Sequence, residues 1–225
     1  MSIDYRYELK FVIDNSRLSD AMQWMYNHTH ARERFKKRKV NTLYFDDVDF
    51  SSVRDNLAGI SSRKKMRLRW YGDGDTSQPY FQMKIRNGRL GYKNSYPIDS
   101  LKESMLGMNA KEIASECEKE MKKQQVIMDT HLTPTLQVCY NRKYYEDLNG
   151  VRITIDQNIS FFGSLPQNKL NSTLFASYPY NVMEVKFKPH LKPQVSELMR
   201  HMHITPKRHS KYLVGLSVLG YAVYI

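Results

Sequence analysis

Charged and apolar side chains alternate along several short segments of this chain, and this alternation constrains its fold most strongly. Near the N-terminus, Arg6, Glu8 and Lys10 alternate with aromatic and aliphatic residues. Side chains two residues apart share one face of a β-strand, so each such segment would have one charged and one apolar face. The pattern predicts an antiparallel sheet whose apolar face is covered by helices, with the charged face turned inward.

Eight segments have this character and are bounded by turn-forming residues. They cover residues 5–13, 41–46, 65–71, 80–86, 91–97, 135–145, 151–157 and 181–188. Asn87-Gly88 and Asn149-Gly150 favour hairpins, because both central positions of a type I′ turn take positive φ. Helical periodicity predicts helices over residues 16–28, 110–130, 193–202 and 210–225. No repeat or linker-like stretch is present, so residues 1–225 are expected to form a single domain.

The charge of the chain is strongly positive and unevenly distributed. Lysine and arginine number 35 against 23 aspartate and glutamate residues, which gives a formal net charge of +12. Residues 63–93 contain nine of these cations and only two carboxylates, Asp73 and Asp75. A solvated sheet face normally mixes both signs, because like charges on neighbouring strands repel. The excess therefore indicates an anionic partner: nucleic acid, an acidic membrane surface or a polyanionic small molecule.

Cysteine content and hydropathy indicate a cytoplasmic protein without a membrane span. Cys117 and Cys139 have neither a metal-ligand spacing nor the density of a disulfide scaffold, so reduced thiols are expected. The charged N-terminus does not resemble a signal peptide. The longest apolar run, residues 212–225, is shorter than the ~20 residues that span a bilayer, although this tail could dock on a membrane protein.

A chain of phosphates suits an inward-facing cationic surface. Arginine binds phosphate oxygens bidentately, and lysine binds them as a point charge. Cations buried without a counter-ion would be costly, so an empty, dry interior is not expected. Glu8 and Glu184 lie on the same predicted strand faces as the cations. A hard divalent cation such as Mg²⁺ or Mn²⁺ would join these carboxylates to phosphates.

Short motifs follow one another in order along nearly the whole chain. They are Tyr-Glu-Leu-Lys-Phe at 7–11, Val-Asn-Thr-Leu-Tyr-Phe-Asp at 40–46, Lys-Met-Arg-Leu-Arg-Trp-Tyr-Gly at 65–72, lysines at 84 and 93, Tyr-Asn-Arg at 140–142, Val-Arg-Ile-Thr-Ile-Asp at 151–156, Met-Glu-Val-Lys-Phe at 183–187 and Ser-Lys-Tyr at 210–212. Each motif alone is weak, but the order and spacing are specific. Together they resemble the VTC domain, the polyphosphate polymerase domain of the vacuolar transporter chaperone complex, within the triphosphate tunnel metalloenzymes.

The resemblance implies an α+β fold, in which an antiparallel eight-stranded β-barrel forms a triphosphate tunnel with helices packed on the outside. It implies catalytic roles for Lys10, Arg67, Arg69 and Lys211. Phosphate-binding roles are implied for Lys84, Lys93, Tyr140, Arg142, Arg152, Lys186 and Ser210. Glu184, assisted by Glu8, would hold Mn²⁺ or Mg²⁺.

The activity that the resemblance implies is transfer of the γ-phosphate of ATP onto a polyphosphate chain. Such a transfer needs positioning and charge neutralisation more than a protein nucleophile. Tunnel triphosphatases carry Glu-x-Glu-x-Lys on the first strand, whereas positions 6, 8 and 10 here read Arg-Glu-Lys, which favours the polymerase. A triphosphatase or nucleotidyl cyclase of the same fold is one alternative. A non-catalytic module that binds polyphosphate, nucleotide or RNA is another.

Three further expectations concern single features. Sequence-specific nucleic-acid binding is not expected, because the aromatic residues alternate onto the face opposite the charges. The acidic run at 46–49 is predicted to cap a turn after a strand rather than to bind metal. The basic run at 36–39 is predicted to be a solvated loop, with attraction of anions toward the tunnel mouth as the alternative.

Overall fold

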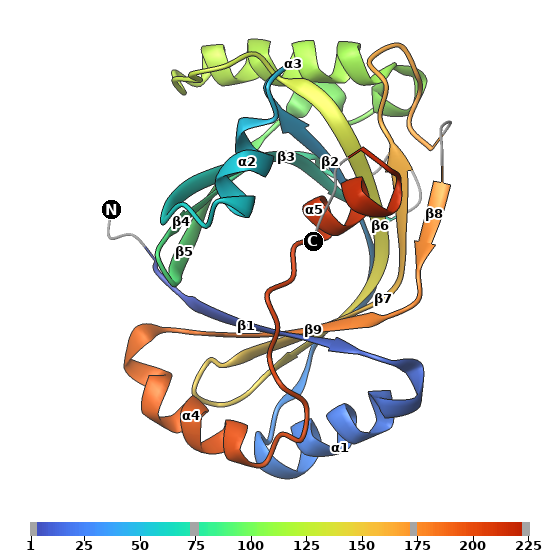
Figure 1. Ribbon diagram of the computed structural model, residues 1–225. Helices are drawn as coiled ribbons and strands as arrows, with labels where there is room; N and C mark the ends of the chain where they lie inside the picture. The colour runs from blue at the N-terminus through green and yellow to red at the C-terminus, as the bar shows by residue number, and fades with distance from the viewer. Residues whose placement is uncertain (1–3, 73–76, 172–174, 222–225) are drawn as a thin grey trace.

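One curved antiparallel sheet organises the molecule (Figure 1). The computed structural model describes residues 4–72, 77–171 and 175–221, and this part of the chain contains nine strands. Their order is β1-β9-β7-β6-β2-β3-β4-β5, and β8 pairs with β7. The strands are β1 Tyr7–Ile13, β2 Arg32–Asp46, β3 Ser62–Tyr71, β4 Tyr80–Asn87, β5 Leu90–Pro97, β6 Thr133–Glu146, β7 Arg152–Gly163, β8 Phe175–Tyr178 and β9 Asn181–Phe187.

The eight segments predicted from alternation are all strands, and they correspond to β1–β7 and β9. Two strand regions were missed. The short β8 was not predicted, and β2 begins at Arg32, nine residues earlier than expected. The prediction of a loop at 36–39 is therefore wrong, because these residues lie in β2. Arg38 and Lys39 pair with β6, and Lys36 and Lys37 lie at a shift in the β2–β6 register. The sequence analysis did not predict a strand here, because lysine and arginine have lower strand propensity than β-branched and aromatic residues.

The sheet curves around a central space, but its ladder of paired strands is open at β1 and β5 (Figure 1). The two edges meet at one isolated antiparallel bridge, between Arg6 and Gly91. Each of these residues donates its backbone N–H to the carbonyl of the other, with both distances at 3.0 Å. The expectation of a closed eight-stranded barrel is therefore not confirmed, because a single bridge does not make a continuous strand pair.

Three helices cover the outer, apolar face of the sheet (Figure 1). They are α1 Leu18–His28, α3 Ala110–Lys123 and α4 Lys192–Arg200. Trp24 of α1 and Val195 of α4 pack in one apolar cluster with residues of β1, β7 and β9. Ile113 of α3 packs in a second cluster with residues of β2, β3 and β4. Of the described residues, no helix is long and apolar enough to cross a membrane.

Helix α3 is shorter than predicted and has a defined start. Asn109 accepts a hydrogen bond from the backbone of Glu112, and the Glu112 side chain accepts one in return from Asn109 N–H. This capping box satisfies donors that the first helical turn leaves free. The helix ends at Lys123 instead of Thr130, and Gln125, two residues later, has a positive φ of 57°.

Helix α5, Lys211–Val218, lies inside the curve of the sheet, so the expectation that the helices pack outside is wrong for this helix (Figure 1). Leu213 and Leu216 pack in a third apolar cluster with inner-face residues of β2, β6 and β7. The short helix α2, Ser51–Leu57, contributes Val53 to the same cluster. These contacts place the start of α5 against the charged part of the inner face.

Candidate phosphate-binding site

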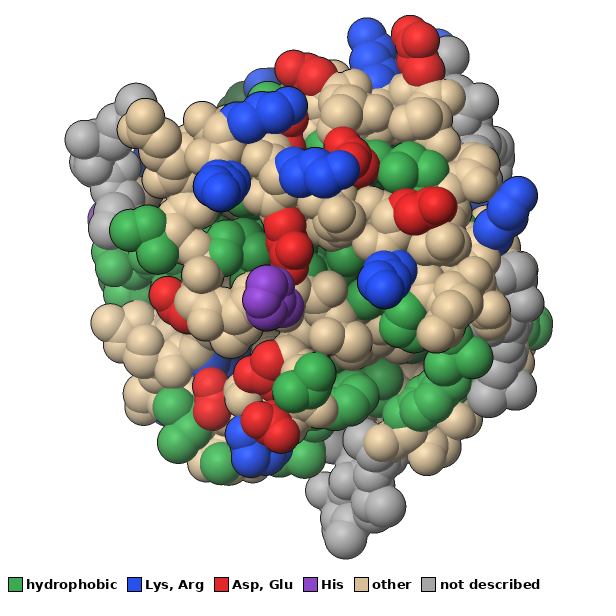
Figure 2. All heavy atoms as spheres, turned by 90° about the horizontal axis from the view of Figure 1, so that it is seen from above, with side chains coloured by type: hydrophobic (Ala, Val, Ile, Leu, Met, Phe, Trp, Pro, Cys, Tyr) green, Lys and Arg blue, Asp and Glu red, His purple; other side chains and the backbone are tan. Residues whose placement is uncertain are grey.

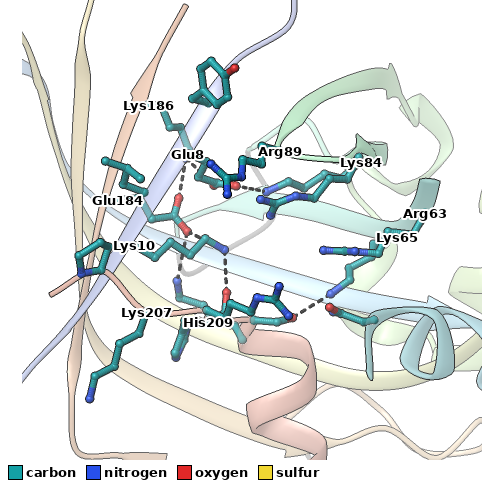
Figure 3. Close-up of a pocket in the computed structure, with 18 of the residues that line it drawn as sticks. Glu8, Lys10, Arg63, Lys65, Lys84, Arg89, Glu184, Lys186, Lys207 and His209 are labelled. Carbon is teal, nitrogen blue, oxygen red and sulfur yellow. Dashed lines mark hydrogen bonds and ion pairs between the residues drawn. The ribbon is translucent and has the colours of Figure 1, made fainter. Parts of the chain in front are cut away.

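The inner face of the sheet encloses a cavity of about 990 Å³ (Figure 3). Among the described residues, its lining includes 14 lysine and arginine side chains and two carboxylates, Glu8 and Glu184. Strand register explains how the cations gather: Lys84 of β4 lies opposite Lys65 of β3 and Lys93 of β5. Because alternate residues share a face, the basic positions of neighbouring strands meet on the inner surface. The composition of this lining suits a polyanionic ligand.

Four cations surround the buried carboxylate of Glu184. The nitrogen–oxygen distances are 2.6 Å to Lys186, 3.6 Å to Lys10, 3.8 Å to Arg142 and 3.9 Å to Lys211. Desolvation favours the neutral acid, but the charges of Lys186 and Lys10 outweigh it and hold the pKa of Glu184 well below its usual range. Glu184 is therefore ionised and partly neutralises the cations around it.

Glu8, the second carboxylate of the lining, also contacts lysines. Its carboxylate lies 2.7 Å from Lys84 Nζ and 3.7 Å from Lys186 Nζ. Lys186 therefore bridges Glu8 and Glu184 (Figure 3). Desolvation opposes ionisation of Glu8, but the charges of Lys10 and Lys84 outweigh it and lower its pKa to about 2.

Asp156 is a fully buried carboxylate behind the cavity wall, and the sequence analysis did not single it out. Arg142 donates hydrogen bonds to both of its oxygens, one of them at 2.7 Å, and Lys211 Nζ lies 2.6 Å away. Despite desolvation, Asp156 raises the pKa of Lys211 and holds that of Arg142 well above its usual range. Asp156 thus fixes the position and charge of two predicted phosphate ligands. Asp156 ends the 151–156 motif and shares a strand face with Arg152, and this position could have indicated that it belongs to the site.

The two arginines of β3 are held by neutral partners. Arg67 donates to Gln82 Oε1 from two guanidinium nitrogens, at 2.9 and 3.1 Å. Arg69 donates to Tyr140 Oη at 3.0 Å and to Thr42 Oγ1 at 3.2 Å. Neutral acceptors orient a guanidinium without cancelling its charge, so both arginines keep their charge for an anionic ligand.

Two tyrosines lie on the charged face: Tyr140, which the resemblance had implied as a phosphate ligand, and Tyr44, which was not expected there. The Tyr140 ring centroid lies 5.0 Å from Lys211 Nζ and 5.1 Å from Arg142 Cζ. Tyr44 stacks on Tyr212 of α5 with ring centroids 4.9 Å apart. The prediction that the aromatic residues alternate onto the face opposite the charges is therefore wrong for Tyr44. The Tyr140 ring attracts both cations through its π-face, and its hydroxyl accepts from β3.

Burial lowers the pKa of two lysines in the cavity and so disfavours their charged form. Desolvation, together with the charges of Lys10 and Lys84, holds the pKa of Lys65 well below its usual range. Desolvation and Lys10 lower the pKa of Lys84 to about 8, even though Glu8 opposes the shift. Lys65 donates to Ser210 Oγ at 2.9 Å. It was not among the predicted ligands, although it lies on the same strand face as the two arginines that were.

The segment that leads into α5 is tied to β1. Lys10 accepts a backbone hydrogen bond from Lys207 N–H at 2.8 Å, and its ammonium donates to the carbonyl of His209 at 2.9 Å. Ser210 then caps the N-terminus of α5. Desolvation and the charges of Lys211 and Lys10 lower the pKa of His209 to about 3, so its buried ring stays neutral. These contacts position Lys211 at the cavity wall.

Eleven of the 13 predicted site residues line the cavity, and Lys93 and Arg152 do not. Lys93 is exposed on β5. Arg152 is exposed at the start of β7, and its Nε lies 3.4 Å from Glu146. Both residues share the inner strand face with cavity residues but lie beyond the lining.

The outer surface over α3 has a different charge pattern. Basic and acidic side chains are interspersed on this face (Figure 2). Ion pairs along the helix join Lys119 to Glu116 at 2.7 Å and Lys123 to Glu120 at 3.1 Å. Exposed pairs of this kind are worth little, typically less than ~1 kcal/mol each. The positive charge of the chain is therefore not spread evenly over the molecule.

Glu8 and Glu184 are the carboxylates that could hold a divalent cation in the lining. Within the described ranges, no group of three or more His, Cys, Asp and Glu side chains is arranged to hold a metal ion. Two carboxylates provide part of the oxygen ligand set that Mg²⁺ or Mn²⁺ requires, and phosphate oxygens could supply the rest. The residues therefore fit a cation that enters with its phosphate ligand better than one held by protein side chains alone.

Residues 5–220 match the family model described as the VTC domain. The chain belongs to the VTC domain family. A relative of this VTC domain is the vacuolar transporter chaperone complex subunit 2 of Saccharomyces cerevisiae, which is 24% identical over 234 aligned residues. The match covers 79% of this chain but 28% of the relative, so the chain spans less than a third of that protein's length.

Two solved structures share the fold of this VTC domain. A protein from Pyrococcus horikoshii has a TM-score of 0.55 at 11% identity, and a putative adenylate cyclase from Vibrio parahaemolyticus has a TM-score of 0.55 at 12% identity. Both matches cover 95% of this chain and 99% of the other. At such low identity the likeness concerns the fold alone.

Proposed function

We propose that this VTC domain is a metal-dependent polyphosphate polymerase, which transfers the γ-phosphate of ATP onto a polyphosphate chain held in the basic cavity. The observation that carries the proposal is the excess of cations over carboxylates in the lining. A phosphate chain complements this excess, because each phosphate brings negative charge and several acceptor oxygens. Membership in the VTC domain family supports a role in polyphosphate metabolism.

The cavity residues would bind and orient phosphates and offset the charge that develops during transfer. Arg67 and Arg69, oriented by neutral partners, would hold phosphate oxygens. Lys211, fixed by Asp156, would supply a charge whose position does not depend on the ligand. A phosphoryl group passing in line between two oxygens needs such positioning and electrostatic stabilisation. Bound through Glu184 and Glu8, a divalent cation would neutralise further phosphate charge.

The test is chain synthesis by the purified protein with ATP and Mn²⁺, followed by electrophoresis of the products and staining for polyphosphate. We expect a ladder of products. Arg67→Gln should slow its growth by on the order of 100-fold, as expected for the loss of one preorganised charged donor. Glu184→Gln should also reduce synthesis. Lys122→Gln, an exposed residue on α3, is the control and should leave the rate unchanged.

Undiminished synthesis by Arg67→Gln would overturn the proposed site. If the wild-type protein forms no ladder but releases phosphate from tripolyphosphate, the activity is that of a triphosphatase. Arg6, at the position where tunnel triphosphatases carry a glutamate, favours the polymerase over this alternative.

A binding module without chemistry is the second candidate, and the pairing of the cavity carboxylates favours it. Glu8 and Glu184 each lie within 2.7 Å of a lysine ammonium, so metal binding would require Lys84 and Lys186 to give up these contacts. Tight calorimetric binding of tripolyphosphate, with neither chain growth nor phosphate release in the presence of Mn²⁺, would establish this function instead.

A cytoplasmic location and action beside a membrane-protein partner complete the proposal. The relative from Saccharomyces cerevisiae is named as a subunit of a complex, and the present chain corresponds to only part of its length. The polyphosphate product would need a separate pore to cross a membrane. Fractionation of the source cells would test this placement: the protein should be found in the cytosolic fraction, or in the membrane fraction together with a membrane-protein partner.

A further inference from the structure

The first half of β2 is an exposed basic strand that the proposed function leaves unexplained. We call residues 32–39 the β2 arm. Six of its eight residues are lysine or arginine, Glu33 is its single acidic residue, and all eight are exposed. The arm pairs with β6, whereas the pairing of β2 with β3 begins only at Val40. At ~3.4 Å per residue, the arm is about 27 Å long.

Two arginines of the β2 arm are held by specific contacts. Arg38 lies over the rings of Phe35, Tyr71 and Tyr144, with Cζ at 5.0, 5.8 and 5.9 Å from the ring centroids. Arg34 Nε lies 3.3 Å from the carboxylate of Glu146. Cation–π contacts orient a guanidinium while leaving its N–H donors available to an anion. The arm therefore presents ordered positive charge.

The β2 arm continues the cationic wall of the cavity. Arg38 lies directly opposite Arg142, a cavity residue, in the β2–β6 register. Glu146 contacts Arg34 of the arm and also Arg152 of β7, at 3.3 and 3.4 Å. Arg152 in turn lies opposite Lys186, another cavity residue. Strand pairing and ion pairs thus connect the basic residues of the cavity to those of the arm, although the β2–β6 register shifts on both sides of Phe35.

The alternative interpretation of the β2 arm is protection of a strand edge. Charged residues on an exposed edge prevent pairing with strands of other molecules. Lysine is especially common in this role, but edge protection does not explain why the cations of the arm adjoin those of the cavity. A predominantly positive strand next to a cationic cavity is better explained by an anionic ligand that extends over both.

We propose that the β2 arm binds the part of a polyphosphate chain that extends beyond the cavity. The inference rests on the proposed function, since it takes the cavity ligand to be a phosphate chain. Tripolyphosphate would contact the cavity alone, whereas a long chain would contact the cavity and the arm together. The arm would therefore add affinity only for chains long enough to reach it.

The experiment compares binding of tripolyphosphate and of long-chain polyphosphate to three proteins. The arm variant is Lys36→Gln/Lys37→Gln, because these exposed lysines are not the arginines that the ring and Glu146 contacts hold. The control variant, Lys111→Gln/Lys122→Gln, removes the same charge from exposed positions of α3. Dissociation constants are measured by calorimetry over a range of NaCl concentrations, and thermal melts verify that each variant is folded.

We expect the arm variant to bind long-chain polyphosphate on the order of tenfold more weakly at low salt, with unchanged affinity for tripolyphosphate. The slope of log affinity against log salt should fall by about 0.7 for each lost contact, the value for a single-stranded polyanion. The control variant should behave as wild type. Equal losses in both variants would show a general charge effect and overturn the proposal.

Two other outcomes are decisive. Unchanged long-chain binding by the arm variant would leave edge protection as the role of the arm. Arm-dependent binding of single-stranded RNA that is tighter than binding of polyphosphate of equal length would assign the arm to nucleic acid and overturn the proposal. Failure of wild-type protein to bind tripolyphosphate would instead contradict the proposed function, and arm-dependent binding of long chains would still support a polyanion surface.

Discussion

Individual lysines in the cavity combine two conflicting requirements, burial and charge. Desolvation and the charge of Lys10 lower the pKa of Lys84 to about 8, and desolvation with the charge of Lys10 holds that of Lys65 well below its usual range. A bound phosphate stabilises the charged form of a lysine and would raise these pKa values. Phosphate binding near pH 8 should therefore be accompanied by proton uptake.

We expect the affinity for tripolyphosphate to fall by on the order of tenfold between about pH 7 and pH 9.5, as Lys84 loses its proton. Calorimetry at pH 8 in two buffers of different ionisation enthalpy measures the proton uptake directly. Lys84→Arg should weaken the pH dependence, because arginine keeps its charge over this range. The same heat of binding in both buffers would contradict the prediction.

The stability of the free protein should change with pH in the opposite direction. The pKa of Lys84 is lowered from 10.5 to about 8 in the folded protein, so the unfolded chain binds more protons between these values. The protonation of Lys84 therefore makes the free energy of unfolding increase as the pH rises from about 8 to 10.5 and decrease as the pH falls over the same range. Phosphate binding thus favours the charged form of Lys84, whereas folding favours its neutral form.

The resemblance to the VTC domain identified most single residues of the site, and alternation placed those that lie on strands on the charged face. The sequence analysis missed Lys65 and Asp156 for different reasons. Lys65 lies two residues before Arg67 on the same strand face, so alternation alone could have identified it. Asp156 is buried, and its importance depends on Lys211, which is distant in sequence but whose ammonium lies 2.6 Å from the carboxylate. Such a contact follows from tertiary structure and leaves no local pattern.

Among the elements, α5 depends most on a close fit. A β-carbon at Gly215 would lie 2.6 Å from Leu136 Cδ2 and 2.7 Å from Phe161 Cδ1, both on the inner face of the sheet. Real β-carbons do not approach other atoms so closely, so α5 or its neighbours would have to shift. Lys211 begins the same helix, and a shift of α5 would disturb its contact with Asp156.

We expect Gly215→Ala to lower the free energy of unfolding by about 1–3 kcal/mol, the typical cost of overpacking, and to weaken tripolyphosphate binding. Chemical denaturation and calorimetry measure the two effects. Gly107→Ala is the matched control, since a β-carbon there meets no atom within 4 Å. Wild-type stability in Gly215→Ala would show that α5 adjusts without cost, and the helix would then not be a rigid support for Lys211.

The elements show where sequence patterns determine the fold and where they do not. Strands with one apolar face were predicted, because burial imposes a period of two on their residues. The β2 arm was missed, since an exposed strand needs no apolar face. The interior position of α5 was also missed. Its apolar residues show that it is buried, but periodicity does not reveal which side of the sheet buries it.

At the scale of the whole molecule, the net charge of +12 and the cationic cavity predict that the free protein is held below its full stability by self-repulsion. Tripolyphosphate should therefore stabilise the fold by more than salt screening does. At a ligand concentration of 100 times Kd, binding to the folded state alone adds about 2.7 kcal/mol to the free energy of unfolding.

We expect tripolyphosphate to raise Tm well above the value in NaCl of equal ionic strength, in a thermal melt monitored by circular dichroism. NaCl screens all charges, whereas tripolyphosphate would neutralise those of the cavity, so the difference between the two isolates the cavity contribution. Arg67→Gln should reduce the response to tripolyphosphate and leave the response to NaCl unchanged. Equal shifts in Tm with both salts would mean that the repulsion is distributed over the surface. The cavity would then not be the main anion-binding site of the molecule.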